Sequence, residues 1–231
     1  MKTITFSDVL IKTSESLENN FKSCISRNEA LINEMVEHLN LLYYWSEKLS
    51  DVNCVPVLRE VNYDLLSSIY ISANGMYRNA FICLRSALEL GLSFFYFVDN
   101  NFKYLQWKKN DFDMKWSLLQ DHEDGVLSKK YMKLFKNNFK EEIFIEEVQD
   151  VYRSCSEYVH GKYEYMHTLH NQQILFDQRK FEEFAKTFLK VAKLITVYMV
   201  IRFSDKQSDF IQDKLVTTFD IAKVYFQGEI A

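Results

Sequence analysis

The chain of 231 residues is 48% hydrophobic and 16% aromatic and carries a formal net charge of −4. This apolar content excludes an intrinsically disordered chain, and the length suits one domain with a sizeable core. The negative net charge excludes the global positive field of a nucleic-acid coat protein, so any contact with nucleic acid must be local.

Residues that favour sharp turns are scarce, with one proline and five glycines in the chain. We therefore expect an all-α fold, a helical bundle with long antiparallel helices and short polar loops. Apolar residues recur at helical spacing over residues 7–49, as one long helix or two end to end, before a loop at Pro56. We expect residues 1–56 to form an N-terminal helical extension packed on a bundle of residues 57–231, within one compact domain.

Cysteine usage and apolar runs bear on the cellular compartment. The four cysteines are scattered without a Cys-x-x-Cys pair, which predicts reduced, buried thiols rather than a disulfide framework or a zinc ribbon. The longest apolar stretches, residues 91–98 and 194–201, fall well short of the roughly 20 residues that span a bilayer. No signal-peptide pattern precedes them. We expect a cytoplasmic protein without a membrane partner.

The segment 76–98 is apolar nearly all round, which is typical of a helix inside a bundle. Arg85 and Glu89 interrupt it one helical turn apart, so the carboxylate can accept both prongs of the guanidinium. Two interpretations stay open, a structural ion pair in the core or part of a site. Downstream, we expect short helices and loops over 99–125, helices over 127–139, 141–160, 178–202 and 209–226, and a less regular segment over 162–173.

Four lysines recur at helical spacing just before the helix predicted over 141–160. Such a stripe can neutralise phosphates, and interleaved aromatic residues can stack on bases. The alternative is a solvated helix face. The candidate RNA-binding residues are Lys129, Lys133, Lys136 and Lys140.

Arg153 and His160 lie seven positions apart on the helix predicted over 141–160. A period of 3.6 residues returns position i+7 to nearly the same azimuth, so both side chains share one face. Arginine is a permanent, fork-shaped phosphate ligand, and histidine exchanges a proton near neutral pH. The pair suits phosphodiester chemistry without a metal. The alternative is an ordinary solvated face on which Glu157 pairs with Arg153 at i+4.

The segments 85–89 and 156–161 together resemble the HEPN superfamily of all-α bundles, in which an arginine, four to six residues and a histidine carry ribonuclease activity. The six-residue spacing here is at the long end of that range. Ser154 stands where many members have asparagine, aspartate or histidine. The resemblance covers residues 57–203 by the arrangement of helices.

The resemblance implies a homodimer in which two motif helices pool their Arg153–His160 pairs in one cleft, with RNA as the partner and with neither metal nor cofactor. His160 would act as base or acid on the 2′-hydroxyl, and Arg153 would hold the scissile phosphate, leaving a 2′,3′-cyclic phosphate. It also implies a toxin or antiphage defence effector with a cognate antitoxin or defence-system partner. The supporting residues would be Arg85, Glu89, Ser154, Glu157 and Tyr158.

Two other functions fit parts of the pattern. A non-catalytic helical adaptor that binds a protein or nucleic acid fits the same bundle. A di-iron bundle would use the Glu-x-x-His spacings of Glu157–His160 and Glu164–His167, but such sites draw their two motifs from different helices. A zinc site would need His160, His167 and His170 together.

Overall fold

The computed structural model describes residues 6–135, 138–162, 174–203 and 215–228. The predicted all-α class is confirmed, since the described residues form helices and no strand, apart from one isolated antiparallel bridge between Phe139 and Phe226. The helices are α1 (Phe6–Lys48), α2 (Val55–Ala73), α3 (Tyr77–Asp99), α4 (Asn101–Lys108), α5 (Trp116–Leu119), α6 (Lys129–Phe135), α7 (Glu141–Val159), α8 (Gln178–Arg202) and α9 (Leu215–Ala222), followed by a 3₁₀ turn at Lys223–Tyr225.

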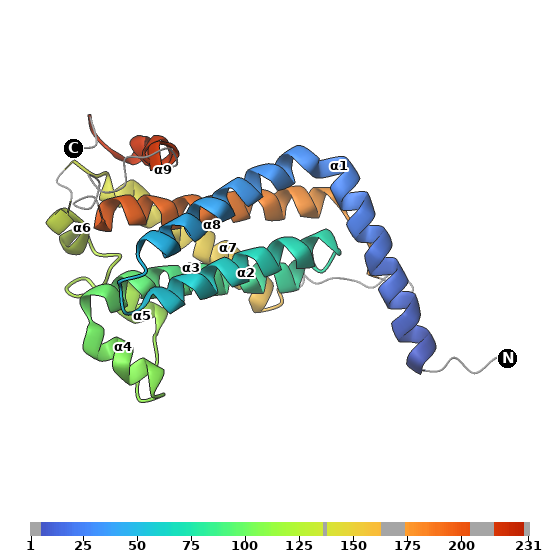
Figure 1. Ribbon diagram of the computed structural model, residues 1–231, viewed down its shortest axis with the longest axis horizontal. Helices are drawn as coiled ribbons and strands as arrows, with labels where there is room; N and C mark the ends of the chain where they lie inside the picture. Colours follow the sequence, from blue (N-terminus) through green and yellow to red (C-terminus); the bar gives the residue numbers. More distant parts are fainter. Residues whose placement is uncertain (1–5, 136–137, 163–173, 204–214, 229–231) are drawn as a thin grey trace.

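Helix α3 lies at the centre of the bundle and packs against α2, α7 and α8 (Figure 1). By length and composition it could span a membrane, yet most of its residues are buried inside the fold. Its phenylalanines stack into an aromatic core with α8, where the rings of Phe95 and Tyr198 lie 4.3 Å apart. The apolar pattern of residues 76–98 therefore corresponds to a core helix, as predicted.

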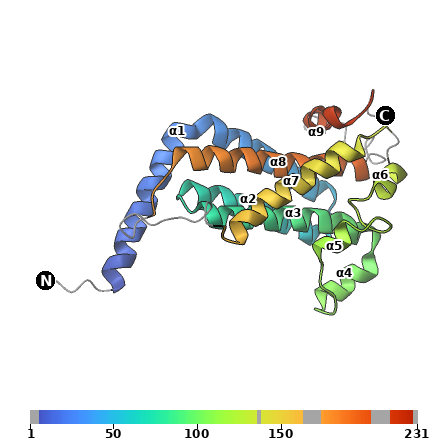
Figure 2. The same ribbon diagram turned by 180° about the vertical axis from the view of Figure 1, so that it is seen from behind.

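Helix α1 is bent at Asn28, whose φ of −130° and ψ of 25° are not helical. Figures 1 and 2 show the half before the bend projecting from one end of the bundle and the half after it running along the bundle. The second half packs against α2 and α8. The Asn28 amide donates to the Cys24 carbonyl and to the Gln178 side chain, so contact with α8 stabilises the bend.

Two predicted helices differ from the observed ones. The helix predicted over 127–139 covers only Lys129–Phe135 among the described residues, because Phe139 is extended and pairs with Phe226. Of the helix predicted over 209–226, the described part contains Leu215–Ala222 and the 3₁₀ turn, while 209–214 lie outside the described residues. The segment predicted to be irregular over 162–173 lies outside them as well, except for Lys162.

All four cysteines are free, as the sequence predicted. Cys24, Cys54 and Cys155 are also buried as predicted, whereas Cys83 is only partly buried. Burial raises the pKa of the Cys24, Cys54 and Cys155 thiols to about 12. At neutral pH these groups are therefore thiols that pack as small apolar side chains.

Candidate functional site

Helix α7 carries the Arg153–His160 motif and is amphipathic, as its spacing predicts. Phe144, Val148, Val151 and Cys155 are buried against α3 and α8, so the opposite face of the helix is turned outward. Burial of this apolar face holds the helix against the bundle and leaves the motif on the surface.

The last turn of α7 ends in a Schellman motif. Gly161 adopts a left-handed φ of 63°, its amide donates to the Tyr158 carbonyl, and the Lys162 amide donates to the Glu157 carbonyl. The left-handed terminator predicted at Gly161 is confirmed. From α3, Arg78 donates through Nε and Nη2 to the carbonyls of Tyr158 and Val159, each at 3.1 Å. His160 therefore projects from a capped helix end.

Arg153 and His160 line the same shallow pocket, which has a volume of about 420 Å³. Both side chains are solvent-accessible, and the Arg153 side chain is 70% exposed. Arg153 Nη1 lies 3.2 Å from Asp150 Oδ1, so Arg153 pairs with Asp150 rather than with the Glu157 that the spacing suggested. An exposed pair of this kind contributes about 0–1 kcal/mol and leaves the guanidinium available to a phosphate. The other residues lining the pocket are Trp116, Gln120, Gln149, Tyr152 and Ser156.

Two aromatic side chains form one wall of this pocket. Trp116 of α5 stacks on Tyr152 of α7, with ring centroids 3.6 Å apart and an interplanar angle of 5°. Burial raises the pKa of Tyr152, the Glu89 carboxylate adds to this effect, and Arg85 opposes it. Tyr152 is therefore a neutral hydroxyl at pH 7. Sequence patterns did not place Trp116 and Gln120 beside the motif, because they come from a different element.

Arg85 and Glu89 form the predicted ion pair, with 3.2 Å between Arg85 Nε and Glu89 Oε1. The pair is partly buried, since 21% of the Arg85 side chain and 36% of the Glu89 side chain are exposed. Arg85 Nη2 also donates to the Tyr152 hydroxyl at 2.8 Å, and Arg85 Cζ lies 5.0 Å from the centroid of the Tyr152 ring. Arg85 thus reaches the motif pocket through Tyr152, and neither member of the ion pair lines that pocket.

The three supporting residues predicted on α7 have separate surroundings. Ser154 Oγ donates to the Asp150 carbonyl, and Ser154 lines a different cavity from the motif. Glu157 pairs with Lys162 at 2.5 Å. Tyr158 is buried, where its ring stacks on Phe81 and its hydroxyl donates to Glu183 at 2.9 Å. Tyr158 therefore anchors the helix rather than contacting a ligand in the motif pocket.

The predicted lysine stripe is divided between two elements and has local partners. Lys129 pairs with Glu142, and Lys133 pairs with Glu141 at 3.1 Å. Lys140 precedes α7 and donates to the Val224 carbonyl at 3.0 Å, while Lys136 lies outside the described residues. RNA that bound here would have to compete with these contacts.

Within the described ranges, no group of three or more histidine, cysteine, aspartate or glutamate side chains is close enough to hold a metal ion. Glu164, His167 and His170, on which the di-iron and zinc alternatives depend, lie outside those ranges.

Comparisons with protein-family models, with curated proteins and with solved structures found no match to this chain.

Proposed function

We propose that the protein is a metal-independent endoribonuclease of the HEPN type. One observation carries the proposal: Arg153 and His160 line a single solvent-accessible pocket. A permanent cation and an imidazole at one site can bind a phosphodiester and move a proton beside it.

The reaction follows from the chemistry of these two groups. The His160 imidazole takes the proton of the RNA 2′-hydroxyl, and the 2′-oxygen attacks the adjacent phosphorus. The bond from phosphorus to the 5′-oxygen breaks, leaving a 2′,3′-cyclic phosphate, and the departing oxygen receives a proton from an imidazolium. Arg153 stabilises the negative charge that builds on the phosphate oxygens.

Trp116 supports RNA as the substrate. One ring face stacks on Tyr152, and the side chain lines the same pocket as the motif. An aromatic side chain beside a phosphate-binding cation can stack on a nucleobase, which contributes about 1–3 kcal/mol per base.

The shallow pocket also supports a homodimer. Among the residues that the structure describes, α5 covers the motif on one side, so a second copy related by a two-fold axis can close the pocket and supply a second imidazole. A role as a toxin or defence effector, held inactive by an antitoxin or another partner protein, follows from such an activity.

The direct test compares cleavage of a mixed RNA pool by matched variants in the presence of EDTA. His160→Ala and Arg153→Ala should each reduce the rate at least a hundredfold, because the first removes the proton acceptor and the second the phosphate ligand. His122→Ala and Arg27→Ala change exposed residues that do not line the pocket and should cleave like the wild type. Equal rates for all four variants would exclude the proposed chemistry.

A second candidate function, a non-catalytic adaptor, is favoured by an apolar stripe on α2. Tyr63, Leu66 and Tyr70 share one helix face and are 64%, 55% and 60% exposed. Exposed aromatic residues are common in protein interfaces. A wild-type protein that binds RNA or a protein partner without cleaving RNA would favour this function.

A further inference from the structure

Two side-chain amides line the motif pocket, one from Gln120 at the end of α5 and one from Gln149 on α7. Both residues are partly buried, and neither side chain forms a hydrogen bond within the part of the chain that the structure describes. The hydroxyls of the pocket are already engaged, since that of Tyr152 accepts from Arg85 and that of Ser156 donates to the Tyr152 carbonyl. The two amides therefore remain available to a ligand.

The stack of Trp116 on Tyr152 brings both glutamines to one aromatic platform. The backbone N–H of Gln120 donates to the Trp116 carbonyl at 3.2 Å, so Gln120 lies one helical turn after Trp116. Gln149 and Tyr152 lie at i and i+3 on α7, where side chains are neighbours. Each glutamine is thus next to one member of the stacked pair. Proteins read single-stranded RNA with such a combination, an aromatic face for the base and hydrogen bonds to its edges.

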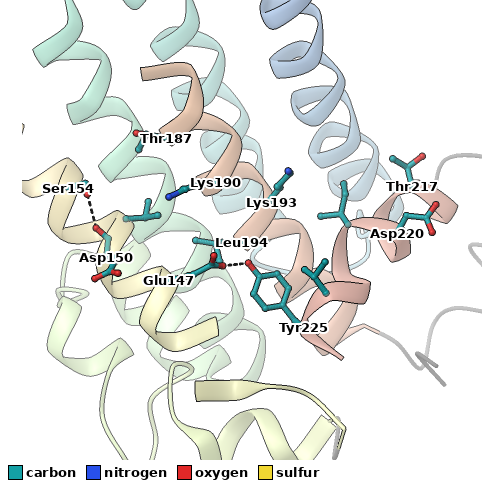
Figure 3. Close-up of a pocket in the computed structure, with 13 residues that line it drawn as sticks. Glu147, Asp150, Ser154, Thr187, Lys190, Lys193, Leu194, Thr217, Asp220 and Tyr225 are labelled. Atoms are coloured by element: carbon teal, nitrogen blue, oxygen red, sulfur yellow. Dashed lines mark hydrogen bonds between the residues drawn. The ribbon is translucent and has the colours of Figure 1, made fainter. Parts of the chain in front are cut away.

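The described residues that line the motif pocket include no carboxylate. The acidic residues on the same part of α7 line a larger cavity, of about 770 Å³, among α7, α8 and α9. Figure 3 shows Glu147 and Asp150 in that cavity, with Glu147 bonded to the Tyr225 hydroxyl. Asp150 also pairs with Arg153, in an exposed contact that a phosphate can replace. The lining of the motif pocket itself therefore presents a cation and no anion to a nucleotide.

The chemistry of the two amides favours one nucleobase. A glutamine amide offers a donor beside an acceptor. Adenine offers the complementary pair on two edges, because its 6-amino group has two hydrogens, one beside N7 and one beside N1. Guanine presents only acceptors, N7 and O6, on its outer edge, which suits arginine or lysine. Cytosine and uracil carry their donor–acceptor pairs on one edge alone. Two glutamine amides therefore match the two edges of an adenine.

We propose that the motif pocket selects an adenine next to the scissile phosphate, and that Gln120 and Gln149 determine this specificity. The adenine stacks on Trp116, its two edges bond to the two amides, and Arg153 holds the adjacent phosphate. The inference rests on the proposed ribonuclease function for its RNA substrate, and it adds the identity of the base beside the cleavage site.

Fluorescence anisotropy with labelled 2′-O-methyl RNA pentamers tests the proposal on the full chain. The pentamers carry uracil at four positions and adenine, guanine, cytosine or uracil at the centre, and they cannot be cleaved because the 2′-hydroxyl is blocked. The wild type should bind the adenine pentamer at least tenfold more tightly than the other three. Replacing the central adenine by purine, which lacks the 6-amino group, should weaken binding at least tenfold.

Matched variants assign the preference to the two amides. Gln120→Met and Gln149→Met keep the length of the side chain but remove its hydrogen bonds. Each should weaken binding of the adenine pentamer at least fivefold, the lower end for one bidentate contact, and that of the uracil pentamer less than twofold. Gln227→Met changes an exposed glutamine that does not line the pocket and should bind like the wild type.

Three results would overturn the proposal. The first is equal binding of the four pentamers by the wild type, or binding of none. The second is tightest binding of the guanine pentamer, which would assign Arg153 to a base edge instead of a phosphate. The third is binding of the adenine pentamer by both methionine variants as tightly as by the wild type. A protein that prefers adenine without cleaving RNA would contradict only the proposed reaction, and one that cleaves RNA without preferring adenine would contradict only the specificity.

Discussion

At the scale of single residues, Tyr152 connects the core helix α3 to the motif pocket. Its hydroxyl accepts a hydrogen bond from Arg85, and its ring stacks on Trp116, which lines the pocket beside it. The Arg85–Glu89 pair therefore orients one wall of the site without lining it. Its partial exposure places its contribution to stability between that of a surface pair and that of a buried pair.

Replacing Glu89 by alanine should lower the free energy of unfolding by about 1–2 kcal/mol, because Arg85 keeps its bond to Tyr152 and its access to water. Thermal denaturation should show a melting temperature lower by about 2–8 °C. The rate of RNA cleavage should also fall. Arg85 supports Tyr152 and Trp116, and without Glu89 it is held less firmly. A loss of 3–5 kcal/mol would instead indicate a fully buried pair.

Asp64 on α2 gives the stability of the fold a pH dependence. Burial raises the pKa of its carboxyl, and the Ser86 side chain partly opposes this. Because the folded state holds the Asp64 proton more tightly than the unfolded chain does, protonation of Asp64 adds to the free energy of unfolding. This contribution is fully present below the ordinary aspartate pKa, about 4, and is lost as pH rises through the folded-state pKa.

Asp64→Asn should therefore be more stable than the wild type at pH 8, where the ionised carboxylate bears the cost of burial. This advantage should shrink toward pH 4. Urea denaturation at the two pH values measures the difference. An advantage of equal size at both pH values would mean that ionisation of Asp64 is not its cause.

At the scale of elements, the C-terminal cap of α7 fixes the turn that carries His160. Gly161→Ala should cost about 1 kcal/mol, because a side chain disfavours the left-handed φ of 63°. The new Cβ would only make van der Waals contact with Arg78 Nη2, at 3.4 Å. The rate of RNA cleavage should fall even at temperatures where the variant remains folded, since the strain acts beside His160. Gly228→Ala, also at positive φ but with no atom within 4 Å of the new Cβ, should leave cleavage unchanged. Equal loss of cleavage in the two variants would contradict this role.

Helical periodicity predicted α7, its buried face and its glycine terminator from local sequence alone, because these features depend on residues within a few turns of one another. The bend in α1 could not be predicted in the same way, since Asn28 bonds to Gln178, far along the chain. The shorter α6 depends on Phe139 pairing with Phe226. Likewise, Arg153 and His160 were predicted to share a face, but Trp116 reaches their pocket only through tertiary stacking on Tyr152.

At the scale of the whole molecule, the ribonuclease proposal requires two chains. Light scattering should report about twice the 27.6 kDa of one chain. Mixing inactive Arg153→Ala and His160→Ala proteins should restore part of the cleavage if each site takes residues from both subunits. A monomer at the concentrations used for cleavage, or no recovery on mixing, would contradict the shared site.

In the proposed reaction, His160 and Arg153 cleave RNA through attack by the 2′-hydroxyl. Mass spectrometry of the products from a short synthetic RNA, digested in EDTA, tests this reaction most directly. The wild type should produce 2′,3′-cyclic phosphate ends, His160→Ala should produce none, and a nucleotide whose 2′-hydroxyl is replaced by hydrogen should not be cleaved. Cleavage of that deoxy position, or cyclic phosphate ends produced equally by His160→Ala, would contradict it.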